Sequence, residues 1–515
     1  MKQYNTPFIG TALVLILASH PVKADENQVY VGQTGVTNTI SIDQYGTSNK
    51  VGADETTINV YQDGTSNTLT VNQEGYANEA GATSANGTLG LEGIAQIGAN
   101  NTIDLTQQNS NSAGNNRVGA IYQSAPDNFG SVTSNSLTIT QTNTALNNAL
   151  GEGDGQSGHS IGEIQQIQTG ETSEMNIATI RQYDGASGSE GGNVINQLVQ
   201  NGSGNLADIT QQYRGNLINV MRQLGTANEA TIIQRAGTDN EINSFLQAGA
   251  ANRSRIEMTG SRNLLLSAIQ NNELVPVAGN IMTLILGGDD NGGDGLGGLG
   301  QFVFNVTKDI QVAQAEIKQL GDDNSLNYVT SGRSFMNQYG FVQDGDGNWL
   351  SGTVDGEENE TAVSQVGDGN RLNFSQSGEK NALAVLYRGK DNELYTAQTG
   401  NENTINISFD GGIAPVSRSN QNNDAALGGF SETALAYSNG LTPGQVLQNG
   451  NLNLATLAIH TGSFNKFAYS QNGDENEIDA IIEGNSNQSV VVQGSSSNYA
   501  YYRQYGNNNQ LIILQ

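Results

Sequence analysis

Apolar and polar residues alternate along much of the chain, in short runs that end at a glycine. In residues 370–376 (NRLNFSQ), Leu372 and Phe374 share one face of an extended segment, and polar residues fill the other face. This period of two predicts a β-strand with one buried face. A helix fits poorly, because positions i and i+2 would lie about 200° apart on its surface. Gln376 has the parity of the buried face, and Gly378 then offers a turn residue that tolerates φ > 0.

The strand and its turn form a unit that repeats every eleven residues. Glycine occupies positions 367, 378, 389 and 400, and asparagine occupies positions 370, 381, 392 and 403. The unit reads Gln-x-Gly-x-x-Asn-x-h-x-h-x, where h is usually apolar. We predict that its polar residues form structural ladders, built from Gln33, Gly35, Asn38, Gln44, Gly46, Asn49, Gln62, Gly64, Asn67, Gln73, Gly75, Asn78, Gln200, Gly202, Asn205, Gln223, Gly225, Asn228, Gln365, Gly367, Asn370, Gln376, Gly378, Asn381, Gly389, Asn392, Gln398, Gly400, Asn403, Gln471, Gly473, Asn476, Gln504, Gly506 and Asn509.

The repeat predicts an all-β, amyloid-like β-solenoid with loop insertions rich in Gly, Asn and Asp. Two units would make one rung of strand–turn–strand with 22 residues, and rungs would stack about 4.8 Å apart. Gln would then lie over Gln and Asn over Asn, so each amide would find a donor and an acceptor along the stack. The alternative is a disordered low-complexity tract, which has no reason to keep an eleven-residue phase.

Repeat blocks alternate with stretches of different composition. The N-terminus resembles a signal peptide, with Lys2, an apolar run over 8–18 and small residues at Val22 and Ala24. Neither end of the chain shows a helix or a charged cap in its sequence pattern. We predict this order: a signal peptide at 1–24, repeats at 25–125, a Gly/Asn/Ser-rich insertion at 126–160, repeats at 161–270, a Gly/Asp-rich linker or loop at 271–310, repeats at 311–411, an insertion at 412–445 and repeats at 446–515.

The amino-acid composition limits the kinds of partner that this protein can bind. The chain has 65 glycines, 36% hydrophobic residues, 14% charged residues and a net charge of −29. Nucleic acid and anionic membrane surfaces are disfavoured, because few Lys and Arg side chains are present to neutralise phosphates. No later segment is a candidate for membrane insertion. The chain has no cysteine, so neither disulfides nor thiolate ligands contribute.

The sequence shows no catalytic constellation, so we expect a protein that is not an enzyme and needs no cofactor or metal. Beyond the predicted signal peptide the histidines are His159 and His460, about 300 residues apart in different blocks. A calcium loop is the minor alternative at 344–348 (DGDGN), although Trp349 stands where such a loop needs glycine. Trp349 and the tyrosines beside glutamines could stack on sugars, or could be outward residues that stabilise the sheet surface.

Three segments resemble the curlin repeat, the building block of bacterial curli fibres. They are 42–49 (IDQYGTSN), 502–509 (YRQYGNNN) and 338–340 (QYG). The resemblance implies a secreted, extracellular fibre subunit of a Gram-negative bacterium that binds other copies of itself, a nucleator and an outer-membrane secretion channel. It also implies adhesion to host or abiotic surfaces. This chain is several times longer than a typical curlin, and its repeats are interrupted.

Together these observations predict an extracellular structural protein that self-assembles into curli-like amyloid fibres for cell adhesion and the biofilm matrix. The alternative is a monomeric, surface-associated β-solenoid adhesin that binds a glycan or an abiotic surface. A β-helical polysaccharide enzyme is a remote third reading, because the acidic residues fall mainly in turns and at outward positions.

Overall fold

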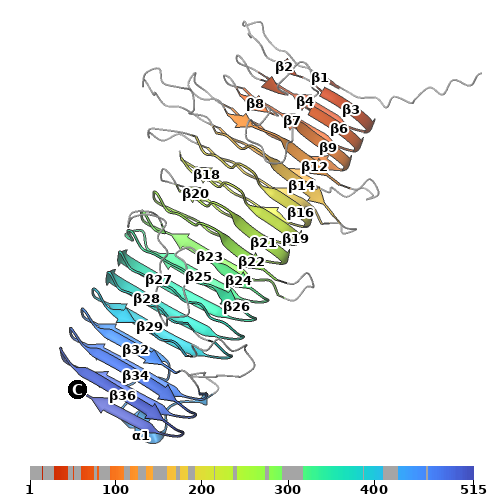
Figure 1. Ribbon diagram of the computed structural model, residues 1–515. Helices are drawn as coiled ribbons and strands as arrows, with labels where there is room; N and C mark the ends of the chain where they lie inside the picture. The colour runs from red at the N-terminus through yellow and green to blue at the C-terminus, as the bar shows by residue number, and fades with distance from the viewer. Residues whose placement is uncertain are drawn as a thin grey trace, which may run out of the picture. The chain divides into compact units, whose positions relative to one another are not determined.

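The computed structural model divides the chain into two compact units, residues 1–251 and 252–515. We describe each unit by itself, and Figure 1 shows the strands of both. The structure describes residues 14–15, 28–29, 31–44, 50–51, 60–74, 78–80, 93–108, 116–125, 135–142, 159–169, 174–183, 192–213, 215–235, 240–272, 278–292, 317–386, 388–409, 427–459 and 462–515.

Strands of the N-terminal unit pair in parallel with strands one rung away. They are β1 (Val14–Leu15), β2 (Gln28–Val29), β3 (Val31–Val36), β4 (Thr39–Ile42), β5 (Lys50–Val51), β6 (Val60–Thr65), β7 (Thr68–Val71), β8 (Glu79–Ala80), β9 (Ile94–Ala99), β10 (Asn101–Thr102), β11 (Arg117–Val118), β12 (Ile121–Ser124), β13 (Asn135–Leu137), β14 (Ile164–Gln168), β15 (Asn176–Ala178), β16 (Val199–Ser203), β17 (Leu206–Ala207), β18 (Gln211–Gln212), β19 (Arg222–Thr226), β20 (Gln234–Arg235) and β21 (Phe245–Ala250). Two long sheets run in the orders β3-β6-β9-β12-β14-β16-β19-β21 and β1-β4-β7-β10-β13-β15-β17.

The C-terminal unit has longer and more regular strands. They are β22 (Ala268–Asn271), β23 (Ile281–Leu286), β24 (Lys318–Leu320), β25 (Ser325–Thr330), β26 (Gln343–Asp344), β27 (Trp349–Glu357), β28 (Arg371–Glu379), β29 (Glu393–Thr399), β30 (Thr404–Ile405), β31 (Gln445–Asn449), β32 (Leu454–Ala458), β33 (Lys466–Asn472), β34 (Glu477–Glu483), β35 (Gln488–Gln493), β36 (Tyr499–Tyr505) and β37 (Gln510–Leu514), with one helix, α1 (Glu432–Ala436). The main sheet runs β23-β25-β27-β28-β29-β31-β33-β35-β37, and facing strands form β30-β32-β34-β36.

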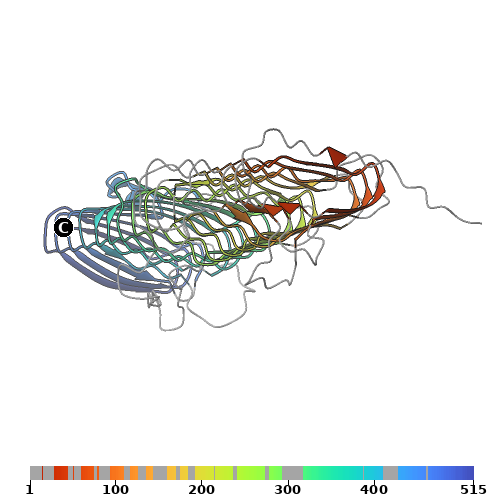
Figure 2. The ribbon, with the colours of Figure 1, turned by 90° about the horizontal axis from the view of Figure 1, so that it is seen from above.

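From β29 to β37, successive strands alternate between the main sheet and the sheet β30-β32-β34-β36, whereas β27, β28 and β29 follow one another in the main sheet. The view from above shows these strands, cyan to blue, following one another in parallel (Figure 2). In β28, Leu372, Phe374 and Gln376 are buried while Arg371 and Asn373 are exposed. This alternation arises because one face of each sheet packs against the facing sheet. The prediction of an all-β solenoid is confirmed.

Rung length differs between the units. In the C-terminal unit, β28 pairs with β29 in a register that places Gln376 over Gln398, 22 residues later. In the N-terminal unit the stacked glutamines are separated by 23 residues at the shortest, between Gln200 and Gln223. The longest separation there is 43 residues. Rungs of 22 residues therefore occur in the C-terminal unit, whereas extra residues between strands lengthen the N-terminal rungs. They also lengthen C-terminal rungs, such as the one in which Gln448 follows Gln398 by 50 residues.

Parts of the predicted insertions belong to the strand stack. β13 lies within 126–160 and pairs with β10 and β15, and β23 lies within 271–310 and pairs with β25. The predicted insertion at 412–445 contains α1, whose N-cap is Ser431. Phe430, Ala434 and Leu441 pack there against Ala468 and Val490, on the outer side of β33 and β35.

Most of the predicted signal peptide lies outside the described residues, except for β1, which pairs with β4. Among the residues that the structure describes, no helix has the length and apolar character needed to cross a membrane.

Candidate functional site: axial ladders and a surface groove

Buried glutamines form ladders parallel to the stacking direction. In the C-terminal unit each Nε2 donates to Oε1 of the glutamine one rung later, over 2.9–3.1 Å, along Gln376, Gln398, Gln448, Gln471, Gln493 and Gln515. The second Nε2 hydrogen of Gln398 goes to main-chain carbonyls, including that of Asn403. Burying an amide without partners costs about 1–3 kcal/mol, so the ladder removes the main penalty of placing glutamine in the core.

The N-terminal unit has two such ladders, one in each long stack. The first runs through Gln33, Gln62, Gln96, Gln123, Gln166, Gln200, Gln223 and Gln247. The second runs through Gln44, Gln73, Gln107, Gln141, Gln182, Gln211 and Gln234, and in it each Nε2 donates to Oε1 of the glutamine one rung earlier. Insertions of different length therefore leave the vertical alignment of the glutamines intact.

Asparagines begin the strands and bind the turns of neighbouring rungs. The Asn381 main-chain N–H and Nδ2 both donate to Asn359 Oδ1, at 3.0 and 3.1 Å, and Nδ2 also donates to the Gly400 carbonyl at 2.7 Å. Asn381 is fully buried. One asparagine thus connects three successive rungs, because Asn359 lies in the rung before it and Gly400 in the rung after it.

Turn glycines are required by both conformation and space. Gly378 has φ +119°, and an added Cβ would lie 2.1 Å from the Gly400 carbonyl oxygen in the next rung. Gly35 has φ +118°, and its Cβ would lie 1.8 Å from the oxygen of Gly64. Only glycine combines these φ values with such close approach of two main chains.

The predicted ladder residues do not all join a ladder. Gln365 and Gln504 are buried, but within the described parts of the chain their Oε1 atoms have no hydrogen-bond partner. Asn38 donates to the Thr34 carbonyl of its own turn, and Asn78 donates to the carbonyl of Gln73. Three predicted ladder residues lie outside the described residues: Gly46, Asn49 and Gly75.

Two further observations concern the asparagines and glycines named in the sequence pattern. The asparagines bonded to an asparagine of a neighbouring rung are Asn67, Asn205, Asn228, Asn370, Asn381, Asn392, Asn403, Asn476 and Asn509. The glycines with positive φ are Gly35, Gly64, Gly202, Gly225, Gly367, Gly378, Gly389, Gly400, Gly473 and Gly506.

A further ladder, at the turns of the C-terminal unit, was not predicted from the sequence. The residue after the turn glycine accepts a main-chain N–H from the rung before: Asp346 Oδ1 from Asp322, and Asp368 Oδ1 from Asp346. Asn401 and Asn451 continue the same arrangement at the opposite turns. The sequence signal is Gly-Asp or Gly-Asn at these turns, at outward positions whose acidic residues the sequence pattern did not connect to a ladder.

Lys390 lies one rung beyond Asp368 in this turn ladder. The Lys390 ammonium, hydrogen-bonded to the carboxylate, holds the pKa of Asp368 below its usual range. The charge of the ladder is therefore partly balanced at this turn, at a surface position where screening keeps the contribution to stability small.

His159 takes the place of an asparagine in one N-terminal ladder. Its main-chain N–H donates to Asn116 Oδ1, and its Nδ1 accepts the N–H of Asn193 at 3.2 Å. Its Nε2 lies 2.8 Å from the carbonyl oxygen of Tyr183, which can only accept, so Nε2 carries the hydrogen. The sequence pattern assigned His159 no role, whereas the fold uses its ring as an amide substitute.

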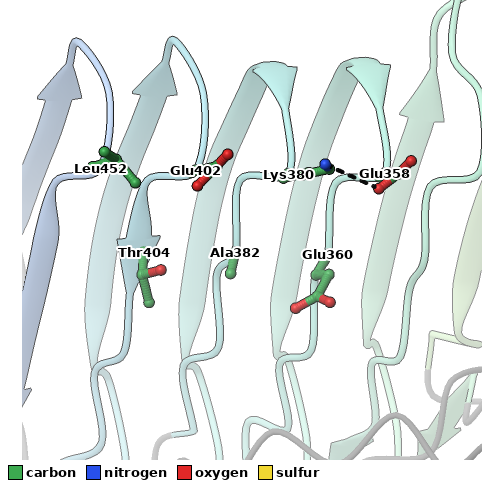
Figure 3. Close-up of a pocket in the computed structure, with 7 residues that line it drawn as sticks. All are labelled: Glu358, Glu360, Lys380, Ala382, Glu402, Thr404 and Leu452. Carbon is green, nitrogen blue, oxygen red and sulfur yellow. Dashed lines mark ion pairs between the residues drawn. The ribbon is translucent and has the colours of Figure 1, made fainter.

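A shallow groove of about 570 Å³ crosses four rungs on one side of the C-terminal unit (Figure 3). Its two rims are a row of turn residues and a row of strand residues: Glu358, Lys380, Glu402 and Leu452, and Glu360, Ala382 and Thr404. Glu358 and Lys380 form an ion pair at 3.8 Å. Partial burial raises the pKa of Glu360. The small side chains of Ala382 and Thr404 leave the hollow open.

Metal ligands are not gathered anywhere in the described parts of the chain. No group of three or more His, Cys, Asp or Glu residues is placed there to hold an ion. The segment 344–348, considered above for calcium, forms the end of β26 and a solenoid turn. Asp346 in this turn accepts the main-chain N–H of Asp322.

Comparison with known proteins agrees with this geometry. A family model described as the curlin associated repeat matches residues 64–108. A search of curated proteins found no match to the chain. The matched segment contains ladder residues from two rungs, including Gln73, Gln96 and Gln107, each bonded to a glutamine of a neighbouring rung. Over residues 64–108 the chain is similar to the curlin repeat, as its sequence predicts.

Proposed function

We propose that this protein is an extracellular structural subunit that stacks with copies of itself into curli-like amyloid fibres, which serve cell adhesion and the biofilm matrix. The observation that carries the proposal is the in-register stacking of parallel strands with continuous glutamine, asparagine and glycine ladders. Each rung offers the next one the same hydrogen-bonding groups, which is the arrangement that allows cross-β growth.

The exposed edge and partly buried apolar side chains of β37 support growth along the stack. Within the described residues β37 is the outermost strand of its sheet. Its inward-facing Leu511 and Ile513 are only half-buried, whereas Val491, which pairs with Ile513 one rung earlier, is fully buried. A further rung would cover this apolar surface and pair the outer edge of β37, at a gain of about 25 cal/mol per Å² of apolar area buried.

The curlin resemblance supplies the remaining parts of the proposal. Curlin-repeat proteins are fibre subunits outside the cell, so we infer a secreted protein of a Gram-negative bacterium that passes an outer-membrane channel and responds to a nucleator. The proposal assigns the chain no catalytic activity. Its negative charge opposes association of copies, so salt should accelerate assembly.

Seeded growth tests the proposal. The chain from residue 25 onward is refolded from denaturant at several concentrations, and thioflavin fluorescence and detergent-resistant, pelletable mass are followed. We expect a lag that shortens with concentration and disappears with seeds. Ile513→Lys, which puts a charge on the inward face of β37, should lengthen the lag. Leu452→Lys adds the same charge at an exposed turn of the same unit and should leave it unchanged.

Two outcomes would contradict the proposal. A soluble β-rich monomer that never seeds would remove the fibre function and favour the monomeric adhesin. Equal kinetics for Ile513→Lys and the unmodified chain would show that growth does not use the β37 edge.

A further inference from the structure

The outward face of the sheet β30-β32-β34-β36 carries an unusual concentration of exposed aromatic residues. Tyr499, Tyr501 and Tyr505 on β36 are 55%, 59% and 63% exposed, and Arg503 lies between the last two on the same face. Four outward positions in succession therefore read Tyr-Tyr-Arg-Tyr. Contiguous exposed aromatic side chains of this kind mark interaction surfaces. We call the outward side of this sheet the tyrosine face.

The side chains of this face are held in place. The rings of Tyr499 and Tyr501 are within 6° of parallel, with centroids 6.5 Å apart. The hydrogen bond to Glu477 on β34 raises the pKa of Tyr501 to about 12. Arg503 pairs with Asp479 at 3.1 Å. A surface that is ordered before binding loses less conformational entropy when a ligand arrives.

The tyrosine face continues along the stack into the groove. The strand register places Glu360, Ala382, Thr404, Leu454, Glu477 and Tyr499 one above the other in successive rungs. The first three of these residues line the groove of about 570 Å³, next to the turn residues Lys380, Glu402 and Leu452 (Figure 3). One continuous track of six rungs thus runs from the groove to the tyrosines, with rungs spaced by about 4.8 Å.

We propose that this track binds an extended polysaccharide without negative charge, lying along the solenoid axis. A pyranose ring has an apolar C–H face that packs on aromatic rings and a rim of hydroxyls that hydrogen-bond to carboxylates and guanidinium groups. The track offers both kinds of group: Tyr499 and Tyr501 for the ring faces, and Glu477, Asp479 and Arg503 for the hydroxyls. Successive sugars of an extended chain repeat at nearly the spacing of the rungs, so one rung can serve one sugar.

The negative charge of the track favours a neutral polysaccharide over anionic polymers. The track carries six acidic side chains, Glu358, Glu360, Glu402, Glu477, Asp479 and Glu483, against the basic Lys380 and Arg503. Anionic glycans and nucleic acids would be repelled by this excess of carboxylates. The inference does not depend on fibre growth, because every residue named lies in one unit of a single chain.

Native affinity electrophoresis tests the proposal with freshly refolded, soluble chain. Gels contain hydroxyethylcellulose, a neutral linear glucan, or carboxymethylcellulose, which has the same backbone with negative charges. We expect the neutral polymer to retard the chain and the anionic polymer to have no such effect. The double variant Tyr499→Ala, Tyr501→Ala should bind about tenfold more weakly. Tyr395→Ala is the matched control, because Tyr395 is 38% exposed on β29 in the other sheet.

A second variant separates binding from folding. Ala382→Trp fills the groove three rungs away from β34, leaves every tyrosine in place and should also weaken retardation. Circular dichroism and thermal unfolding check that each variant keeps the solenoid. The proposal is overturned if hydroxyethylcellulose does not retard the unmodified chain, if both polymers retard it equally, or if Tyr395→Ala weakens binding as much as the double variant.

Discussion

Replacing Gly378 by alanine tests whether the glycine ladder sets the spacing of the rungs. Gly378 adopts φ +119°, outside the region that residues with a Cβ normally occupy. The new Cβ would lie 2.1 Å from the Gly400 oxygen and 2.8 Å from its carbonyl carbon, both main-chain atoms of the next rung. Neither atom can rotate away as a flexible side chain would, so the two rungs must separate locally.

The expected cost follows from the contacts that this separation breaks. The Gly400 N–H donates to the Ser377 carbonyl at 3.0 Å, and Asn381 Nδ2 donates to the Gly400 carbonyl at 2.7 Å. Losing or stretching both bonds costs about 1 kcal/mol each, and the strained φ adds about 1–2 kcal/mol. Gly378→Ala should therefore lower the free energy of unfolding of the C-terminal unit by about 3–4 kcal/mol.

Gly347→Ala is the matched control in the same unit. Gly347 has φ +65°, and an added Cβ would meet nothing within 4 Å. Asp391 occupies the corresponding position two rungs on with φ +54°, so a side chain is tolerated there. The control should cost about 1 kcal/mol or less. Urea unfolding of soluble chain, followed by circular dichroism, measures both variants. Equal losses for Gly378→Ala and Gly347→Ala would refute the argument from close approach.

Three further predictions follow from the ladders and the core. Gln398→Leu should lower the free energy of unfolding in urea by about 2–4 kcal/mol, because it leaves buried amide groups of two neighbouring rungs unpaired. Gln365→Leu should lower it clearly less, because the Gln365 Oε1 has no hydrogen-bond partner within the described residues. Equal losses for the two variants would contradict the ladder account. His159→Asn should leave the stability of the N-terminal unit unchanged, whereas His159→Leu should lower its free energy of unfolding by about 1–3 kcal/mol, because the buried N–H of Asn193 loses its acceptor. Thermal unfolding of both variants measures the difference. Burial raises the pKa of Tyr502 to about 12, so stability should be intact below pH 10, the ordinary tyrosine value, and should fall as the pH rises toward 12; Tyr502→Phe should flatten this alkaline loss in unfolding curves at pH 8–12.

The local pattern of the sequence determined the strand, the turn and the inward residues. Leu372 and Phe374 alternate with polar residues, and Gly378 follows Gln376 at a fixed distance, so each unit folds in the same way wherever it occurs. Strand alternation and the left-handed turn depend only on neighbours within one unit. The family resemblance rests on these same local features, and the match at residues 64–108 agrees with it.

Only the tertiary structure decided which residues stack on one another in neighbouring rungs. Gln398 stacks on Gln448, 50 residues later, and Gln123 stacks on Gln166, 43 residues later, across insertions whose lengths no local pattern specifies. The place of His159 in an asparagine ladder likewise depends on where the preceding insertion returns the chain to the stack.

The groove and the tyrosine face exist for the same reason. Tyr499 and Ala382 are 117 positions apart in the sequence, but four parallel pairings bring them into one column. The sequence by itself therefore determined the rung, because a rung is made of short-range preferences. The order and alignment of the rungs were decided only by hydrogen bonding between strands that are distant along the chain.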